Sequence, residues 1–439
     1  MLTSESKQPY LEAFKEIRAA GVLSGPAWLE KLRQGGIATF GGIGFPTLKN
    51  EDWKYTNVEP IAAQSYVQAN GEAQSVGGTE LFAQALVETD APCLVFVNGI
   101  YVAALSRTGD LPTGLRLGSL ADFIKQNDPV VARELGRHAS TEQQHFVALN
   151  TAFIGEGAVV ELAPGCRLER PVYLLFASTS MTRPVISHPR ILLLLGAGSE
   201  AKIVESFVGV SGKTYFCNAV TELVGGADSV VEHFRLQQES DKGFHVGTLA
   251  ANLARGCHLT AHAMTLSGSL VRNNVRVLLN GEDAECVLNG LYLGDGNQHI
   301  DNYTLIEHVS PKASSLELYK GLLGGSAHGV FNGKIVVHKD AQKSNARQTN
   351  KNLLLSENAV IDSKPQLEIH ADDVKCSHGS TIGQLDADAL FYLRSRGLDP
   401  AAARSLLSFA FASDVVQRLG IENLRRRLDD YLVGRFGAW

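Results

Sequence analysis

The middle of the chain, from about residue 158 to residue 386, is a succession of short apolar runs without a helical period. Some runs include a polar position, as residues 158–162 (Ala-Val-Val-Glu-Leu) do, and others are wholly apolar, as residues 191–195 are. Alternation with a period of two is typical of a half-buried strand, and a short apolar run bounded by turn residues is typical of a fully buried one. The pattern therefore predicts that this region is built from strands.

Clusters rich in Gly, Asp, Asn, Ser and Lys interrupt these runs at a spacing of roughly 28 residues, within the range of repeat architectures. They lie at 196–199, 225–228, 254–257, 280–283, 310–313 and 338–341. A regular period with strands on both sides of each turn favours a solenoid in which every coil buries its apolar face on the next. A β-sandwich also spaces its strands evenly, but it rarely extends this far without a helix. We therefore predict a mostly β fold, with a parallel β-helix as its core.

The segment before the strands is predicted to be mainly helical. Apolar positions between residues 10 and 32 recur every three to four residues and are interrupted at 21–26, which predicts two short amphipathic helices. Residues 35–44 are rich in Gly and are expected to form a loop. Asn98-Gly99, between two apolar runs, predicts a small hairpin, and residues 120–149 again have a helical period.

Helical patterning returns after residue 386. Pro400 suits the first position of a helix, Asp399 before it is a plausible N-cap, and Gly420 is expected to separate the last two helices. We therefore expect three regions: a mainly helical N-terminal region with a hairpin (1–150), a parallel β-helix core (151–386) and a C-terminal helical domain (387–439).

Composition and charge exclude several classes of function. The 439 residues are 44% hydrophobic and 20% charged, so the chain resembles neither a disordered segment nor a coiled coil. Its net charge of −6 provides no basic surface for nucleic acid or anionic lipid. No apolar stretch approaches the ~18 residues of a membrane helix, and residues 1–8 are polar, so we expect a cytoplasmic protein. The six cysteines are scattered without a CxxC pair, so reduced thiols are expected.

Familiar catalytic motifs are missing. Gly212-Lys-Thr214 looks like the end of a phosphate loop, but the position that should hold the first glycine is Phe207, and no helix is expected to follow. The sequence contains no GxSxG, HExxH or GxGxxG pattern. The common hydrolase, metalloprotease and dinucleotide-binding templates therefore do not apply.

Cys376 and His378 are the best candidates for chemistry. In a strand, residues two positions apart share a face, so the thiol and the imidazole would project side by side and offer S and N ligands to zinc, copper or an iron–sulfur centre. A closed metal site needs about four ligands, so others would have to come from elsewhere, for example from another chain. His370 and Asp372 could orient His378. The alternative is that Cys376 is a core residue and the other three are ordinary strand or turn residues.

Eight segments along the chain form a recognisable set. They are 45–56, 146–153, 188–190, 330–335 (VFNGKI), 342–348 (QKSNARQ), 364–369 (KPQLEI), 376–379 (CSHG) and 391–397 (FYLRSRG). Together they resemble one family over the whole chain, the SufB/SufD scaffold proteins of the SUF iron–sulfur cluster assembly machinery. The chain looks most like the SufD branch, because it lacks the Gln-Asn-Trp-Ser stretch of the SufB branch and has Gly-Ser after His378 where that branch has Glu-Ala.

The resemblance implies a right-handed parallel β-helix that pairs with a SufB-type chain, with His378 facing the partner where a transient iron–sulfur cluster would be built. It also implies that the C-terminal helices dock a SufC-type ABC ATPase. The residues expected at that contact are Phe391, Tyr392, Arg396, Leu406 and Leu407. A homodimer in isolation and the binding of a flavin both stay open.

The leading hypothesis is thus a non-enzymatic scaffold subunit. The alternative is a β-helical polysaccharide lyase or hydrolase, which would need clustered carboxylates for acid and base catalysis. Carboxylates do occur in the strand region, at Glu282, Asp283, Glu285, Asp295 and Asp301, but mostly beside turn glycines. A third reading is an interaction solenoid without metal chemistry.

Overall fold

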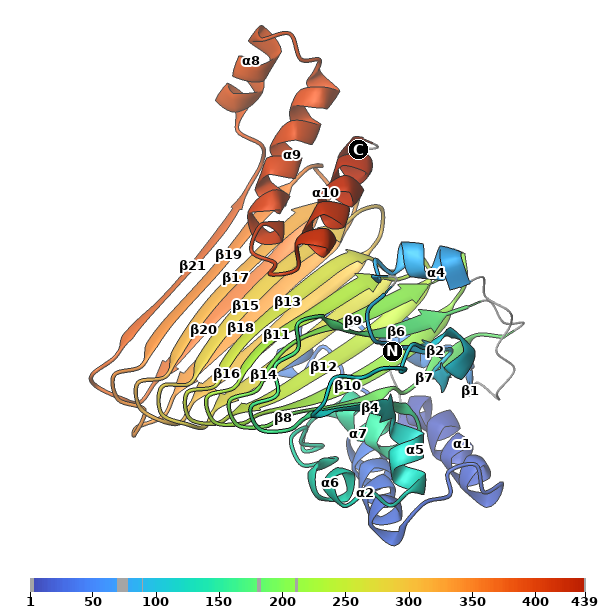
Figure 1. Ribbon diagram of the computed structural model, residues 1–439. Helices are drawn as coiled ribbons and strands as arrows, with labels where there is room; N and C mark the ends of the chain where they lie inside the picture. Colours follow the sequence, from blue (N-terminus) through green and yellow to red (C-terminus); the bar gives the residue numbers. More distant parts are fainter. Residues whose placement is uncertain (1–3, 69–77, 89, 180–182, 210–211, 438–439) are drawn as a thin grey trace.

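The computed structural model describes residues 4–68, 78–88, 90–179, 183–209 and 212–437 (Figure 1). Two long parallel sheets lie face to face, and helices pack on their outer faces. The N-terminal elements are η1 (Ser4–Lys7), α1 (Gln8–Ala19), α2 (Ala27–Ile43), η2 (Glu51–Trp53), α3 (Glu59–Ala62), β1 (Val67–Gln68), α4 (Gly78–Gln84), β2 (Cys93–Val97), β3 (Ile100–Tyr101), η3 (Ala103–Leu105), β4 (Leu115–Ser119), α5 (Leu120–Lys125), α6 (Pro129–Glu134) and α7 (His145–Ala152).

Successive strands of the solenoid enter the two sheets in turn. The first sheet has the order β20-β18-β16-β14-β12-β10-β8-β5-β4, and the second has the order β21-β19-β17-β15-β13-β11-β9-β6-β2-β3. Their bounds are β5 (Gly157–Leu162), β6 (Val172–Ser178), β7 (Val185–Ser187), β8 (Arg190–Leu195), β9 (Glu200–Gly209), β10 (Tyr215–Gly225), β11 (Val230–Gln238), β12 (Gly243–Leu253), β13 (His258–Ser267), β14 (Leu270–Leu279), β15 (Glu285–Gly294), β16 (His299–His308), β17 (Ser314–Leu323), β18 (His328–Val337), β19 (Asn345–Leu354), β20 (Val360–Ile369) and β21 (Lys375–Gly383). The predicted mostly β fold with a parallel β-helix is confirmed.

The coils repeat at the predicted interval. Paired residues of neighbouring strands are 27 residues apart between His258 and Glu285 and 31 apart between Ser314 and Asn345. Several predicted turns contain a residue in the left-handed conformation. It is a glycine at Gly198 and Gly256, an Asp at Asp228 and Asp283, whose short polar side chain tolerates that backbone, and a Lys at Lys312. These turns reverse the chain from one sheet to the other.

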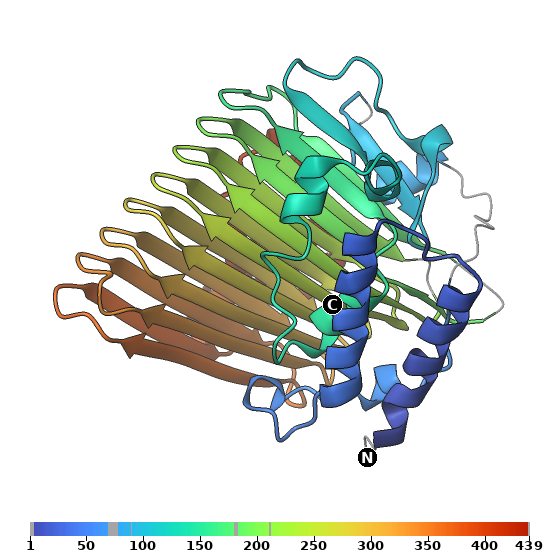
Figure 2. The ribbon, with the colours of Figure 1, turned by 90° about the horizontal axis from the view of Figure 1, so that it is seen from below.

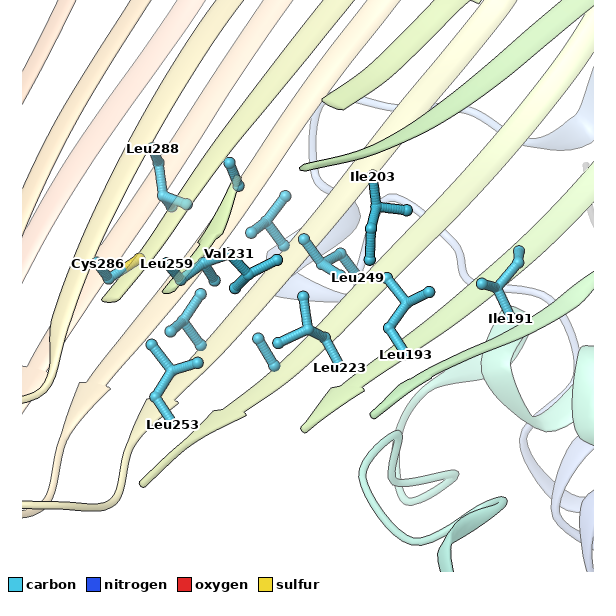
Figure 3. Packing of buried hydrophobic residues seen from close by; sticks show 14 of the residues in the cluster. Ile191, Leu193, Ile203, Leu223, Val231, Leu249, Leu253, Leu259, Cys286 and Leu288 are labelled. Atoms are coloured by element: carbon cyan, nitrogen blue, oxygen red, sulfur yellow. The ribbon is translucent and has the colours of Figure 1, made fainter. Parts of the chain in front are cut away.

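The lumen between the sheets holds one long apolar core (Figure 3). Alternate residues of each strand point inward, so Ile203 of one sheet meets Leu193 and Leu223 of the other within the same cluster. Burying each such side chain stabilises the fold by about 1.5–3 kcal/mol. Cys257 and Cys286 are buried in this cluster, as expected for small core residues.

The helices α1, α2 and α7 lie against the outer face of the first sheet (Figure 2), whereas α4 packs with the second sheet. The expected interruption between two helices is confirmed, but the loop predicted at 35–44 is wrong, because α2 continues to Ile43. Its glycines allow close packing: a Cβ on Gly36 would lie 2.7 Å from the backbone nitrogen of Ala152 in α7. The hairpin at Asn98-Gly99 is confirmed. The helical pattern at 120–149 corresponds to three short helices, α5, α6 and α7.

Three helices complete the chain: α8 (Ala387–Ser395), α9 (Pro400–Val416) and α10 (Glu422–Gly437). Asp399 caps α9 by accepting a hydrogen bond from the Ala402 N–H, and Pro400 begins the helix, as predicted. Val415 of α9 and Leu428 of α10 pack on the outer face of the second sheet. In Figure 1, α8 and the start of α9 project beyond the sheets.

Candidate functional site

The last coil of the solenoid is open. β20 and β21 stand at the ends of the two strand orders, so within the described residues neither has a strand on its outer side. Most residues of β21 are exposed, whereas β9 and β10 near the other end are almost wholly buried. The last coil therefore presents two unpaired strand edges and an uncovered inner face (Figure 1).

Cys376 and His378 lie together on that inner face. β21 pairs in parallel with β19, so that Cys376 is opposite Ala346 and His378 is opposite Gln348. Ala346 and Gln348 are both buried in the lumen, which places Cys376 and His378 in the inward-facing row. Cys376 packs against the lumen core, whereas His378 is exposed. The strand thus brings the thiol and the imidazole to the mouth of the solenoid.

The thiol of Cys376 is not an activated one. Burial raises the pKa of Cys376, although a hydrogen bond with the backbone of Ala346 opposes the shift. Only the thiolate is a strong metal ligand, so Cys376 has to lose a proton before it can bind a metal. A neutral imidazole carries no such requirement, which makes His378 the more readily available of the two ligands.

His370 and Asp372 are exposed and lie in the turn that precedes β21. The backbone N–H of His370 donates to the carbonyl of Val337 at 2.8 Å, which fixes the turn. Among the described residues, neither side chain forms a hydrogen bond or an ion pair with His378, and the imidazole itself has no such partner.

A row of polar residues runs from His378 at the open end into the buried lumen. Glu317, Gln348 and His378 occupy successive paired positions on β17, β19 and β21, and we call these three residues the lumen column. Gln348 Nε2 donates to Glu317 Oε2 at 2.7 Å. Burial raises the pKa of Glu317 to about 7, although hydrogen bonds from Gln348 and Thr304 oppose the shift. Sequence reasoning missed Glu317 and Gln348, although Gln348 ends one of the segments that carried the family resemblance.

A second set of hydrogen bonds fastens the last coil across the lumen. The hydroxyls of Ser363 on β20 and Ser380 on β21 are 2.7 Å apart, and Ser363 donates to Asn350 Oδ1 at 2.8 Å. Asn350 in turn donates to the carbonyl of Tyr319 at 3.2 Å. These bonds join both sheets, so the exposed inner face of the last coil is held in a defined shape.

Two cavities bear on where a functional site could lie. One, of about 310 Å³, lies along β19 and β21 and is lined by both Gln348 and His378. A larger one, of about 630 Å³, lies at the opposite end near Arg107 and Arg167 and contains none of the residues that sequence reasoning selected. The described residues contain no group of three or more His, Cys, Asp or Glu side chains placed to hold a metal ion. Cys376 and His378 would therefore need ligands from outside this chain.

Other segments on which the family resemblance rests form structural contacts. In the 188–190 segment, Arg190 is fully buried and donates to Glu222 at 2.6 Å and to Asn150 of α7 at 3.0 Å. Glu222 also accepts the backbone N–H groups of Gly136 and His138. In the 45–56 segment, the ring of Trp53 lies 3.8 Å beneath the guanidinium of Arg272. These contacts fix the N-terminal region on the first sheet.

The C-terminal helices present an apolar surface. Phe391 is 74% exposed, Tyr392 is 55% exposed and Leu406 is 46% exposed. The guanidinium of Arg396 lies 5.2 Å from the centre of the Tyr392 ring, and Leu407 is half-buried. We call the exposed residues Phe391, Tyr392 and Leu406 the α8–α9 patch. Exposed large apolar side chains on a projecting helix pair are typical of a protein contact.

The fold belongs to the class of parallel β-solenoids with helical ends, and comparison of the sequence identifies the family. Residues 4–174 match the SufBD protein N-terminal region, and residues 176–411 match the SufBD core domain of SUF system FeS cluster assembly. The chain belongs to the SufBD family of iron–sulfur cluster assembly proteins. No helix among the described residues is long and apolar enough to cross a membrane.

The similarity to individual relatives points to the SufD branch. The chain is 32% identical to the iron-sulfur cluster assembly protein SufD of Escherichia coli over 387 residues, which are 88% of each chain. It is 33% identical to an iron-sulfur cluster assembly SufBD family protein of Synechocystis over 90% of this chain and 88% of the relative. SufD of Bacillus subtilis is 24% identical over 96% of both chains. The chain is therefore SufD-like.

Proposed function

We propose that this chain is a non-catalytic scaffold subunit of a cytoplasmic SUF complex and pairs through its last coil with a SufB-type chain. The observation that carries the proposal is the open coil, with Cys376 and His378 on its inner face, in a member of the SufBD family. The nascent iron–sulfur cluster is cargo at this contact. His378 binds iron there, and Cys376 assists once it is deprotonated.

The unpaired strand edges support pairing with another chain. Free backbone N–H and C=O groups on an exposed edge are a template for a further strand, and stable proteins normally cover such an edge. Val360, Ile369 and Ile382 on β20 and β21 are 43–51% exposed, so a partner would also bury apolar surface. A second copy of this chain offers the same edges, which makes a homodimer the expected state when no SufB-type chain is present.

The ligand count supports a shared site. An iron–sulfur cluster is normally held by about four protein ligands, and this end of the chain supplies two. The remaining ligands would come from the partner. This arrangement would allow the cluster to leave when the two chains separate, as a scaffold requires.

The α8–α9 patch supports docking of a SufC-type ABC ATPase. An exposed aromatic pair on a helix suits a helix-in-groove contact, in which apolar side chains enter a groove of the partner. The second half of α9 and α10 are anchored on the second sheet, so movement of a docked ATPase would be transmitted to the solenoid.

The lyase or hydrolase alternative has less support. Three of the five carboxylates that suggested it form ion pairs within the chain: Glu282 pairs with Lys312 at 2.6 Å, Glu285 pairs with His258 at 2.9 Å, and Asp301 pairs with Arg272 in the interior. A general acid or base has to be free to exchange a proton with substrate.

Anaerobic reconstitution with a SufB-type chain and a SufC-type ATPase tests the proposal. His378→Ala should form the complex normally but lower the yield of iron–sulfur cluster at least tenfold, because the imidazole ligand is gone. His370→Ala is the matched control and should behave as wild type. Wild-type cluster yield with His378→Ala would refute the assignment and leave an interaction solenoid without metal chemistry.

A further inference from the structure

The side-chain amide of Gln348 forms a hydrogen bond through its nitrogen, whereas its oxygen has no partner among the described residues. Its side chain is buried, Nε2 donates to Glu317 Oε2 at 2.7 Å, and Oε1 has no hydrogen-bond partner among the described residues. An unsatisfied buried polar atom costs about 1–3 kcal/mol, so such an atom calls for an explanation. Because the donor end of the amide faces Glu317, the acceptor end is the one left for another group.

His378 is the neighbour that can use this acceptor. It occupies the position on β21 paired with Gln348, on the same inward-facing side, and both residues line the 310 Å³ cavity. Its imidazole also has no hydrogen-bond partner among the described residues. Neighbouring strands lie about 4.8 Å apart, so side chains at paired positions on one face are close enough to interact.

Gly333 on β18 makes room for this amide. A Cβ at position 333 would lie 2.3 Å from Gln348 Nε2 and 2.9 Å from its Cδ, so any larger residue would displace the side chain. Gly333, Gln348 and His378 come from three separate segments that carried the family resemblance. The fold brings these segments together at one point of the lumen, which indicates that they serve one purpose.

We propose that Gln348 is a positioning residue for His378, with Oε1 accepting a hydrogen bond from the imidazole N–H. This bond fixes which ring nitrogen carries the proton and turns the other nitrogen outward as the metal ligand. Histidines that bind metal ordinarily donate their second N–H in this way, and losing the acceptor lowers metal affinity by about 10- to 100-fold. The inference rests on the proposed role of His378 in binding iron.

The test uses the complex with a SufB-type partner, in which only this chain carries ¹³C- and ¹⁵N-labelled histidine. The ring shifts of His378, assigned by comparison with His378→Gln, report its tautomer. We expect one tautomer in the wild type and loss of that preference in Gln348→Leu, which removes the acceptor. Gly333→Ala, which displaces the amide, should act like Gln348→Leu.

Gln237→Leu is the matched control, because Gln237 is also a fully buried amide, on β11, and its Oε1 accepts hydrogen bonds from Thr265 at 2.7 Å and from Asn273 at 2.9 Å, away from the last coil. It should leave the tautomer of His378 unchanged. An unchanged tautomer in folded Gln348→Leu would overturn the inference, as would an equal loss in folded Gln237→Leu. These readouts need no cluster, so they are independent of the His378→Ala result that decides the proposed function. With iron, Gln348→Leu should lower the apparent affinity about tenfold.

Discussion

The two ends of the solenoid are built in opposite ways. At the N-terminal end, β4 pairs antiparallel with β5, and the β2–β3 hairpin extends the other sheet beyond β6, so the first coil is covered by the chain's own residues. At the C-terminal end, β20 and β21 have free edges, and the nearby helices pack on the outer face of the second sheet and leave those edges open. This difference supports the proposed pairing through the C-terminal end, where free strand edges are available to another chain.

The lumen differs between the two halves as well, as two buried carboxylates illustrate. Near the covered end, burial would raise the pKa of Glu205, but the charges of Arg235 and His233 outweigh it and hold the pKa at about 2. Arg235 Nη2 is 2.9 Å from Glu205 Oε2. Near the open end, Glu317 has only neutral hydrogen-bond partners, and its pKa is raised to about 7. The covered half is thus stabilised by a compensated ion pair, whereas the open half contains an uncompensated acid.

The largest effect is expected for Val204→Asp. Val204 is fully buried in the cluster between the second sheet and the C-terminal helices, so an unpaired carboxylate there should lower the free energy of unfolding by on the order of 4 kcal/mol. Val336→Asp is the matched control. Val336 also lies in an apolar run, but it is only half-buried and faces outward between Glu307 and Glu368, so about 1 kcal/mol is expected, mainly from charge repulsion. Chemical denaturation measures both, and equal losses would contradict the assigned strand faces.

The next largest effect is a change of protein stability with pH. Because the folded-state pKa of Glu317 lies above its ordinary value of 4.5, the folded protein retains a proton that the unfolded chain releases between pH 4.5 and 7. The contribution of Glu317 to stability is therefore present below pH 4.5 and is lost as the pH rises through 7, by about 3 kcal/mol. Glu317→Gln should remove this loss and be more stable than wild type at pH 8 but not at pH 4.5.

For Glu205→Gln we expect the opposite dependence of stability on pH. The folded-state pKa of Glu205 is lowered, so its stabilising contribution is present above pH 4.5 and is lost as the pH falls toward 2. The variant should be less stable than wild type at pH 7, because Arg235 would be left buried without its counter-ion. If unfolding titrations gave both variants the same pH dependence, the contrast between the two halves would fail.

Much of this architecture could be predicted because it depends on local pattern. Turn residues such as Asp228 and the cap at Asp399 act within a few residues of themselves, so their effect is visible in the sequence. The helical residues 35–43 could not be predicted, because Gly is a poor helix former unless a close approach such as that of Gly36 to α7 offsets its cost.

The candidate site could be predicted only in part, for a related reason. Cys376 and His378 share a face through the period of a single strand, which spacing reveals. The partnership of His378 with Gln348 depends on the register between two coils, and the lengths of the turns set that register. The lumen column therefore became visible only once the coils were aligned in space.

A smaller effect is expected for Phe391→Ser in the α8–α9 patch. Phe391 is 74% exposed, so stability should be unchanged, whereas affinity for a SufC-type ATPase should fall by at least about 30-fold, which corresponds to about 2 kcal/mol. Val433→Ser on α10, at a residue that is 60% exposed, is the matched control and should bind normally. Titration calorimetry with the purified ATPase measures both. Equal affinities for the two variants would place the contact elsewhere.

The smallest effect tests directly whether a partner binds at the open end of the solenoid. Ile382 on the inner face of β21 is 51% exposed in the chain alone, and a partner that covers the last coil would bury it. Ile382→Asp should therefore weaken pairing with a SufB-type chain by about 10-fold, or 1.4 kcal/mol, because a carboxylate would have to enter the contact. Val22→Asp, at a residue 72% exposed in the N-terminal region, should leave pairing unchanged. If sedimentation showed that Val22→Asp weakens pairing and Ile382→Asp does not, the partner would bind near the covered end, and the open edges would need another explanation.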